Sequence, residues 1–294
     1  MTDNSSRIAI VGAGAWGTAL ANVAVRAGRT ATLYARDPNA VEMMMRTGRN
    51  KLLPIDPKVE VTADITLISK ADIILLAVPA QSLREAIGNL SPFVRARVPV
   101  IVCAKGIERG TGKFVTEIIA ECAPHTRPGV LSGPSFAADV VCGLPTAVTL
   151  AMPNKRLAAL LAKTLSSKMF RVYYSTDVRG VEIGGALKNV LAIAAGITEG
   201  RGYSASAVAA LTTRGLAELI RFGEAYGAQR KTLIPEFNIT RQHLRVSSNV
   251  QDICERRSAL HSGARSASIY QSLNVRKSLS SGRKDGAYDA SHGS

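Results

Sequence analysis

The sequence is poor in the residues that build metal sites, disulfide frameworks and membrane spans. Its 294 residues include four cysteines without C-x-x-C spacing, at Cys103, Cys122, Cys142 and Cys254. This pattern predicts neither a metal site nor a disulfide framework, and it is typical of reduced core cysteines in a cytoplasmic protein. No apolar run reaches the roughly 18 residues of a membrane-spanning helix, and residues 1–6 lack the charged and apolar regions of a signal peptide. We therefore expect no membrane span.

Aromatic and acidic residues are also scarce. Aromatic residues make up 5% of the chain, and 22 Asp and Glu residues face 37 Lys and Arg residues, which gives a net charge of +15. A basic chain can bind nucleic acid, but here the basic residues are dispersed and the aromatic residues are too few for a stacking platform. We expect no nucleic-acid partner. The positive field would attract an anionic small substrate and an anionic cofactor. The alternative is a basic surface that only aids solubility, which would account for most of the excess.

A glycine-rich turn follows the first apolar run of the chain. The run at 8–11 leads into Gly12-Ala13-Gly14-Ala15-Trp16-Gly17, which has the form G-x-G-x-x-G. In this pattern Gly12 permits a tight turn, Gly14 lets a pyrophosphate approach the backbone, and Gly17 lets the next helix pack closely on the sheet. A helix closed by Gly28 and a second apolar strand at 31–35 follow at the spacing of a βαβ unit. The segment predicts a dinucleotide site; the alternative is a glycine-rich turn of another α/β protein.

Strand and helix patterns alternate along residues 7 to 150. We expect strands at 8–11, 31–34, 73–78, 100–104, 129–131 and 147–151, and helices at 17–27, 38–46, 81–88 and 113–122. Near-continuous apolar strands separated by helices predict a Rossmann-like, doubly wound parallel sheet that is covered on both faces. From residue 177 the pattern changes to helices at 181–196 and 205–226. The predicted fold class is therefore α/β, followed by an incomplete all-helical second domain.

Three regions follow from these patterns. Residues 1–176 form the dinucleotide-binding domain, residues 177–231 begin a helical substrate domain, and residues 232–294 are a divergent tail. The tail is polar and serine-rich, with basic pairs such as Arg256-Arg257 and Arg283-Lys284. It shows no sustained helical or strand period, so we expect it to be poorly ordered.

The residues after the second strand bear on the choice of cofactor. The strand ends in Tyr34-Ala35-Arg36-Asp37. An acidic side chain at this position binds the ribose hydroxyls of NAD, whereas the planar guanidinium of Arg36 suits a 2′-phosphate. Asp37 could instead cap the next helix before Pro38. We favour NADPH, with NADH as the alternative. Arg36 could also be a solvated surface charge with no role in cofactor binding.

Three further segments could carry chemistry. They are 102–106 with Lys105 at the end of an apolar strand, 131–137 around Gly133 and Ser135, and 184–190 with Lys188 inside an apolar helix. A lysine on such a helix either extends to water or is held in a site. The pair Gly184-Gly185, one turn earlier, would let a ligand or another backbone approach. A buried lysine can have its pKa lowered enough to transfer a proton near neutrality, so Lys188 is a candidate catalytic group.

The order of these motifs resembles a known family. Besides the turn at 12–17, the segments that carry the resemblance are Val78-Pro79, Ala104-Lys105-Gly106, Ser132-Gly133-Pro134-Ser135-Phe136-Ala137, Gly143-Leu144-Pro145-Thr146, Gly184-Gly185-Ala186-Leu187-Lys188-Asn189 and Thr213-Arg214-Gly215-Leu216-Ala217-Glu218. Over residues 7–231 the chain resembles bacterial NAD(P)-dependent glycerol-3-phosphate dehydrogenases. The resemblance implies reversible reduction of dihydroxyacetone phosphate to sn-glycerol 3-phosphate, a cytoplasmic reaction that supplies phospholipid synthesis.

The resemblance also implies roles for individual residues. Lys188 would be the proton-transfer residue. The other positions would contact ligands: substrate at Lys105, Gly133 and Ser135, and cofactor at Gly12, Gly14, Ala15, Trp16, Gly17, Arg36, Lys105 and Ala137. The substrate would be a small phosphorylated molecule, the cofactor NADPH or NADH without a metal, and a homodimer is the assembly to test.

The sequence departs from the family after residue 231. The family continues with a G-L-G-D-L-V-L-T-C segment and a serine-arginine-asparagine element that holds the substrate phosphate, whereas this chain reads Thr232-Leu233-Ile234-Pro235-Glu236-Phe237. A shift of reading frame would give such a switch. The second hypothesis is therefore a catalytically impaired nucleotide-binding fragment, with a weakly folded second domain. A third, a dehydrogenase of hydroxy acids, is disfavoured by the segment at 133–137.

Overall fold

The computed structural model describes residues 6–51 and 53–236. Eight strands form the main sheet in the order β10-β9-β8-β7-β6-β1-β2-β5. Their bounds are β1 Arg7–Val11, β2 Thr30–Tyr34, β5 Val59–Thr62, β6 Ile73–Leu76, β7 Pro99–Val102, β8 Arg127–Ser132, β9 Thr146–Ala151 and β10 Phe170–Ser175. A separate hairpin pairs β3 Arg49–Asn50 with β4 Leu53–Pro54.

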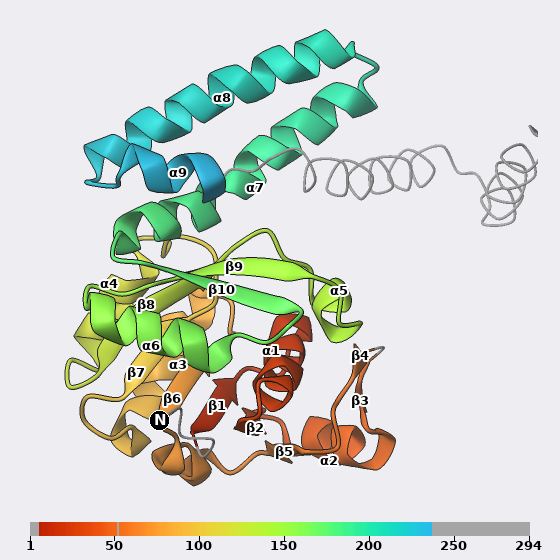
Figure 1. The fold of residues 1–294 in the computed structure, drawn as a ribbon, viewed down its shortest axis with the longest axis vertical. Coiled ribbons are helices and arrows are strands. Elements are labelled where there is room, and N and C mark those ends of the chain that lie inside the picture. The colour runs from red at the N-terminus through yellow and green to blue at the C-terminus, as the bar shows by residue number, and fades with distance from the viewer. Residues whose placement is uncertain (1–5, 52, 237–294) are drawn as a thin grey trace, which may run out of the picture.

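Helices cover both faces of this sheet (Figure 1). They are α1 Ala15–Arg26, α2 Pro38–Thr47, α3 Leu83–Leu90, α4 Val115–Cys122, α5 Ala137–Val141 and α6 Lys155–Leu165, with short 3₁₀ helices η1 Ile65–Lys70, η2 Ala80–Ser82 and η3 Ser91–Phe93. Alternate residues of each strand enter opposite layers: Ile8 and Ile10 pack with α1, whereas Ala9 and Val11 pack with α3 and α4. Each large apolar side chain buried in this way stabilises the fold by about 1.5–3 kcal/mol.

The predicted Rossmann-like arrangement is confirmed by the strand order. Strands β5-β2-β1-β6-β7-β8 follow the order expected of a doubly wound dinucleotide-binding sheet. The neighbours β2 and β6 both run parallel to β1. The chain therefore reverses its direction of travel across the sheet between β1 and β6, and a crevice opens there at the carboxyl ends of the strands.

The expectation of a wholly parallel sheet is wrong at one pair of strands. Strand β9 runs antiparallel to β8, with Ser132 opposite Thr149, and β10 then pairs parallel to β9. A parallel crossover needs a helix long enough to return the chain across the sheet. The only helix in the link between β8 and β9 is the five-residue α5, so the chain turns back and β9 runs antiparallel beside β8.

The second region consists of α7 Val178–Gly200, α8 Ala205–Ala225 and α9 Arg230–Glu236. Figure 1 shows these helices together beyond the β9–β10 side of the sheet. The first half of α7 contacts β8 and β9 and is buried, whereas Val190, Ile193 and Ile197 of its second half have exposed fractions of 61%, 47% and 44%. Helix α9 crosses the expected boundary at residue 231. The expectation of a poorly ordered tail falls largely on residues 237–294, outside the described residues.

Strands β5 and β10 escaped prediction for a common reason. Strand β10 reads FRVYYS and alternates buried with exposed side chains at the edge of the sheet, so it lacks the continuous apolar run of the central strands. Strand β5 forms the opposite edge and has only four residues. Edge strands carry a weaker hydrophobic pattern because fewer neighbours cover them.

Candidate active site

The glycine-rich turn lies at the carboxyl end of β1, against the end of β6. Gly12 has a φ of +105°, and a Cβ there would lie 2.9 Å from the Ala77 carbonyl oxygen. At Gly17 a Cβ would lie 1.9 Å from the Gly12 carbonyl oxygen, so α1 packs directly on the turn. Gly14, the N-cap of α1, has no heavy atom within 4 Å of the Cβ position. The turn therefore excludes side chains at Gly12 and Gly17 to satisfy its own packing, but leaves open space at Gly14.

A hairpin residue fixes this turn from outside. Asn50 donates a hydrogen bond to the Ala13 carbonyl oxygen at 2.7 Å and another to the Thr18 hydroxyl at 2.8 Å. Thr18 is fully buried, and its hydroxyl also donates to the Gly14 carbonyl oxygen. The sequence pattern gave no reason to select Asn50, because its partners lie more than 30 residues away. A spacing of that size carries no periodic signal.

A cavity of about 390 Å³ opens beside the turn. Its walls come from the residues after β1, β2 and β6 and from α3, and they include Gly12, Ala13, Arg36, Pro79 and Ser82. The volume lies within the range of small-molecule sites, and the position is that at which doubly wound sheets bind nucleotides. The open space at Gly14 and the N-terminus of α1 suit a pyrophosphate. The residues present thus fit a dinucleotide.

Arg36 and Asp37 have different surroundings at the end of β2. Asp37 is the N-cap of α2, where its carboxylate accepts a hydrogen bond of 3.0 Å from the Asn39 amide and Pro38 follows at the first helical position. This is the capping arrangement that the sequence left open. Arg36 is exposed and lines the cavity. The guanidinium is therefore the cation at the cavity mouth, and the carboxylate beside it is already bound to a helix end.

Lys188 lies where the second region meets the sheet. It is 5% exposed, and its Nζ donates a hydrogen bond of 2.7 Å to the Gly133 carbonyl oxygen, just past the end of β8. Gly185 lies one turn earlier on the same face of α7, and a Cβ there would lie 2.7 Å from the Ser132 hydroxyl and 3.7 Å from Cγ of Lys105. The missing side chain at Gly185 therefore lets α7 approach both segments. The structure brings Lys105, Gly133 and Lys188 together from three separate parts of the sequence.

The other sequence-predicted positions lie around these two centres. Lys105 follows β7 and is exposed, and Ser135 is partly buried in the segment after β8. Ala15 is exposed at the start of α1, whereas Trp16 and Ala137 are partly buried against the core. Ala137 is the first residue of α5, which packs on α1. All of these residues lie near the carboxyl edge of the sheet.

Ser132 is a candidate that the sequence reasoning passed over. It is 4% exposed, and its hydroxyl has no hydrogen-bond partner within residues 6–51 and 53–233. A buried polar group without a partner costs about 1–3 kcal/mol. The residue stood inside the quoted segment at 132–137, but only its burial beside Gly185 distinguishes it from an ordinary small residue.

A second polar group that sequence reasoning missed joins α4 to α7. The buried carboxylate of Glu182 accepts hydrogen bonds from the amide and the hydroxyl of Thr116, at 2.8 and 2.7 Å. Arg179 pairs with both Glu182 and Glu117, and its guanidinium lies 3.8 Å from the centre of the Phe114 ring. Burial raises the pKa of Glu182 above its usual value, and the hydrogen bonds from Thr116 oppose that rise. These contacts fasten the first turns of α7 to the sheet domain.

The cysteines in the part of the chain that the structure describes are free thiols. Cys103 is buried, and burial raises the pKa of its thiol. Cys142 is exposed, so the expectation of a core position is wrong for that residue, and Cys254 lies outside the described residues. In that part, no group of three or more His, Cys, Asp or Glu side chains could hold a metal ion.

One helix has the length and composition of a membrane span. Helix α7 has a mean hydropathy of 1.3 over its most apolar window, and 61% of that window is buried inside the protein. The same test is passed by buried helices of soluble folds. Two charged side chains, Glu182 and Lys188, lie buried in α7 and make protein contacts, as expected of a helix that packs against a domain.

Sequence and structure comparisons agree on the relatives of this chain. Residues 7–158 match the profile of the NAD-dependent glycerol-3-phosphate dehydrogenase N-terminus, and residues 177–240 match that of its C-terminus. A glycerol-3-phosphate dehydrogenase, NAD(P)+, of Bradyrhizobium sp. (strain ORS 278) is 58% identical over 236 residues, which cover 79% of this chain and 72% of the relative. The enzyme of the same description from Rhodopseudomonas palustris (strain BisB5) is 55% identical over 229 residues, covering 77% and 70%.

A solved structure gives the same result. The crystal structure of glycerol-3-phosphate dehydrogenase from Coxiella burnetii has a TM-score of 0.78 and 32% identity, and the match covers 92% of this chain and 84% of that chain. The profiles, the two relatives and this structure all extend from the nucleotide domain into the helical region. The chain therefore belongs to the NAD-dependent glycerol-3-phosphate dehydrogenase family.

Proposed function

We propose that this chain catalyses the reversible, NAD(P)H-dependent reduction of dihydroxyacetone phosphate to sn-glycerol 3-phosphate. The observation that carries the proposal is the buried Lys188 ammonium, held 2.7 Å from the Gly133 carbonyl oxygen on the α7 face whose Gly185 lies next to the Lys105 side chain. The relatives that match the chain are named for this activity. In the cytoplasm, the product would supply glycerophospholipid synthesis.

Lys188 is the proton-transfer residue in this proposal. The bound nicotinamide would supply or accept the hydride. As a carbonyl oxygen of the substrate gains negative charge, the Lys188 ammonium donates the proton that completes the hydroxyl group. In the oxidation direction the neutral amine accepts that proton. The hydrogen bond to Gly133 holds the ammonium in place, and α7 and β8 keep bulk water away from it.

Lys105 supports the same step by its charge. Lys105 lies on the loop after β7, and its Cγ is near Gly185 on the α7 face that carries Lys188. A cation there stabilises the developing oxyanion and attracts the substrate phosphate. Gly133 and Ser135 complete the proposed substrate contacts: the Gly133 carbonyl oxygen lies beside the Lys188 ammonium, and the Ser135 hydroxyl offers a donor.

NADPH is the proposed cofactor, with NADH as the alternative. The supporting observation is Arg36, an exposed cation at the mouth of the cavity next to a carboxylate that already caps α2. Gly12, Gly14 and Gly17 form the turn for the pyrophosphate, with Ala15 and Trp16 in the first turn of α1. Ala137 at the start of α5 is a further proposed cofactor contact. No metal takes part in the proposed reaction.

A second candidate function is binding of the cofactor without efficient turnover. It is favoured by the exposed apolar side chains of α7, Val190, Ile193 and Ile197, and by the family segments that the sequence lacks after residue 231. Under this hypothesis the nucleotide domain folds and binds the cofactor, whereas the substrate phosphate lacks charge-assisted hydrogen-bond donors.

One experiment separates the two candidates. The full chain is purified, NADPH affinity is measured by fluorescence titration, and NADPH consumption is followed with dihydroxyacetone phosphate. NADPH binding with turnover that is lost in Lys188→Met supports the enzyme, whereas binding without turnover selects the second candidate. Size-exclusion chromatography with light scattering on the same sample tests the proposed homodimer.

A further inference from the structure

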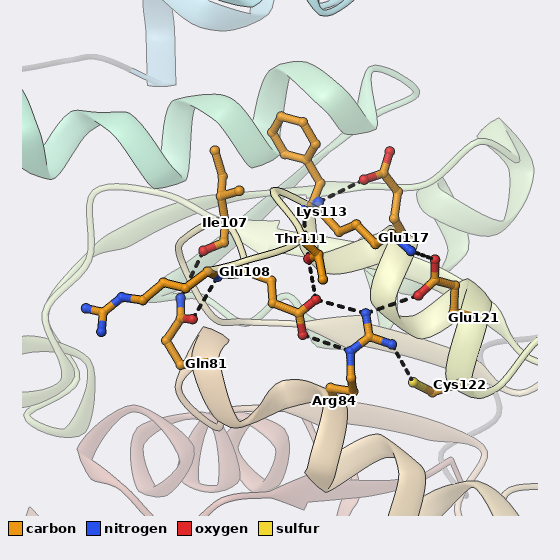
Figure 2. A network of polar contacts seen from close by, with 11 residues as sticks. Gln81, Arg84, Ile107, Glu108, Thr111, Lys113, Glu117, Glu121 and Cys122 are labelled. Atoms are coloured by element: carbon orange, nitrogen blue, oxygen red, sulfur yellow. Dashed lines mark hydrogen bonds and ion pairs between the residues drawn. The ribbon is translucent and has the colours of Figure 1, made fainter.

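The loop that carries Lys105 is held by side chains from the neighbouring strand connection. This loop, residues 103–114, joins β7 to α4, and Figure 2 shows its middle enclosed by polar contacts. Gln81 of η2 donates a hydrogen bond of 2.9 Å from Nε2 to the Ile107 carbonyl oxygen, and its Oε1 accepts one of 3.0 Å from the Arg109 amide. A single side chain thus pairs with the backbone on both sides of Glu108.

Arg84 binds the same stretch through a fork of two hydrogen bonds. Its Nε and Nη2 donate to the two carboxylate oxygens of Glu108, at 2.9 and 2.8 Å. The Glu108 side chain is only 11% exposed and also accepts from the Thr111 hydroxyl. Arg84 reaches α4 as well, through an ion pair of 3.1 Å with Glu121 (Figure 2).

The charge that this network uses is permanent at neutral pH. The hydrogen bonds from Arg84, and next those from Thr111, lower the pKa of Glu108 to about 2. The Glu108 carboxylate therefore stays ionised near neutral pH, and both hydrogen bonds from Arg84 are kept. Planar two-point pairing fixes direction as well as distance, which a lysine in place of the arginine would not do.

The segment that holds the loop also forms a wall of the nucleotide cavity. Pro79 and Ser82 line that cavity, on either side of Gln81. The backbone of Gly106, the residue after Lys105, packs against Ala80, because a Cβ at Gly106 would lie 3.1 Å from Cβ of Ala80. Residues 79–84 therefore touch the cofactor side with one surface and the Lys105 loop with the other.

We propose that Gln81, Arg84 and Glu108 are positioning residues that set the place of Lys105 relative to the cofactor cavity. The inference rests on the substrate-binding role of Lys105 given under the proposed function. The Arg84 side chain is 39% exposed, so solvent partly screens its ion pairs and limits what they add to the stability of the fold. The effect on position can be larger, because a displacement of about 1 Å in a group that binds the reacting molecule can reduce the rate roughly 100-fold. The contacts are thus placed to affect substrate binding more than folding.

The test compares Arg84→Gln with a matched control, Arg95→Gln. Arg95 makes the same kind of contact at a remote place: it donates to the Asp72 carboxylate at 2.9 Å and to the Ala71 carbonyl oxygen at 2.7 Å. Three quantities are measured on each full-length variant: NADPH affinity, the affinity of glycerol 3-phosphate for the NADPH complex by calorimetry, and the rate of Lys105 acetylation by mass spectrometry. The complex with both reduced ligands cannot react, so binding is measured without turnover.

We expect Arg84→Gln to weaken glycerol 3-phosphate binding by roughly tenfold or more and to change the Lys105 labelling rate, with a smaller loss of NADPH affinity because Lys105 is one of several proposed cofactor contacts. Arg84→Lys should fall between wild type and Arg84→Gln, since it keeps the charge but loses the fork. Equal effects of Arg84→Gln and Arg95→Gln, or unchanged substrate affinity in Arg84→Gln, would overturn the inference. If the wild type binds no glycerol 3-phosphate, the proposed function fails, and the labelling rate of Lys105 still decides whether the loop is positioned by Arg84.

Discussion

A methyl group at Gly14 should weaken cofactor binding and leave the fold intact. Gly14 is the N-cap of α1, with φ of −84° and ψ of −177°, which alanine adopts without strain. No heavy atom lies within 4 Å of the new Cβ, so the substitution meets only the space in which the pyrophosphate would lie. Alanine is a poorer N-cap than glycine, at a cost of at most about 1 kcal/mol. A domain with about 5–15 kcal/mol of stability tolerates that loss.

The size of the binding effect follows from the phosphate contacts at the helix end. A hydrogen bond to a charged group contributes about 1.5–3 kcal/mol. If the Cβ of Gly14→Ala displaces the phosphate enough to break one such bond, the Kd for NADPH rises roughly 10- to 150-fold. In Gly17→Ala, by contrast, the Cβ would lie 1.9 Å from a backbone oxygen. That overlap forces the helix off the turn, at a cost of about 1–3 kcal/mol or more.

Fluorescence titration with NADPH and thermal melting of the same variants test this reasoning. Gly88→Ala is the control, because Gly88 is exposed in α3, has open space around its Cβ position and is absent from the cavity wall. It should raise stability by up to about 1 kcal/mol and leave NADPH affinity unchanged. A Kd of Gly14→Ala within about twofold of wild type, or a melting temperature as low as that of Gly17→Ala, refutes the assignment of the turn as the pyrophosphate site.

Three further substitutions test the second region and its contact with the sheet. Lys188→Met should lower kcat roughly 100- to 10,000-fold with NADPH affinity little changed, and a kcat within tenfold of wild type in steady-state assays contradicts the proton-transfer role. Ser132→Ala should leave the free energy of unfolding unchanged or higher by about 1 kcal/mol, because it removes a buried hydroxyl without a partner; a clear loss in denaturant titrations argues against that reading. Glu182 has a raised pKa from burial, so the folded state binds its proton more tightly than the unfolded state, and stability relative to Glu182→Gln should rise as pH falls from neutrality toward the ordinary glutamate pKa. If the melting temperature of wild type relative to Glu182→Gln does not change as pH falls, or decreases, the ion pair with Arg179 outweighs the effect of burial on the Glu182 pKa.

The central part of the fold follows from hydrophobic pattern alone. Strands β1, β6 and β7 are buried at every apolar position, and each was predicted from a continuous apolar run. The glycine-rich turn was predictable because its chemistry is local: each glycine is required by atoms within one βαβ unit. Arg36 and Asp37 were predictable to the extent that a cap and a strand end are also local features.

The antiparallel β9 and the polar contacts of the site depend on long-range packing instead. Arg84 meets Glu108, 24 residues later, and Glu182 meets Thr116, 66 residues earlier. No period or short motif links such positions, because the sheet order alone decides which loops become neighbours. Ser132 shows the same limit: its residue type suggests a surface group, and only the approach of α7 at Gly185 buries it.

The site as a whole lies across the boundary between the two regions. The cofactor cavity is built entirely from residues 11–90, whereas Lys188 reaches its place only because α7 packs on the end of β8. Under the proposed function, cofactor binding and proton transfer therefore depend on different parts of the chain. Contacts of Glu182 and Arg179 with α4 fasten the first turns of α7, which carry Gly185 and Lys188. Loss of the Glu182 contacts would therefore displace the proposed proton-transfer residue while NADPH still binds.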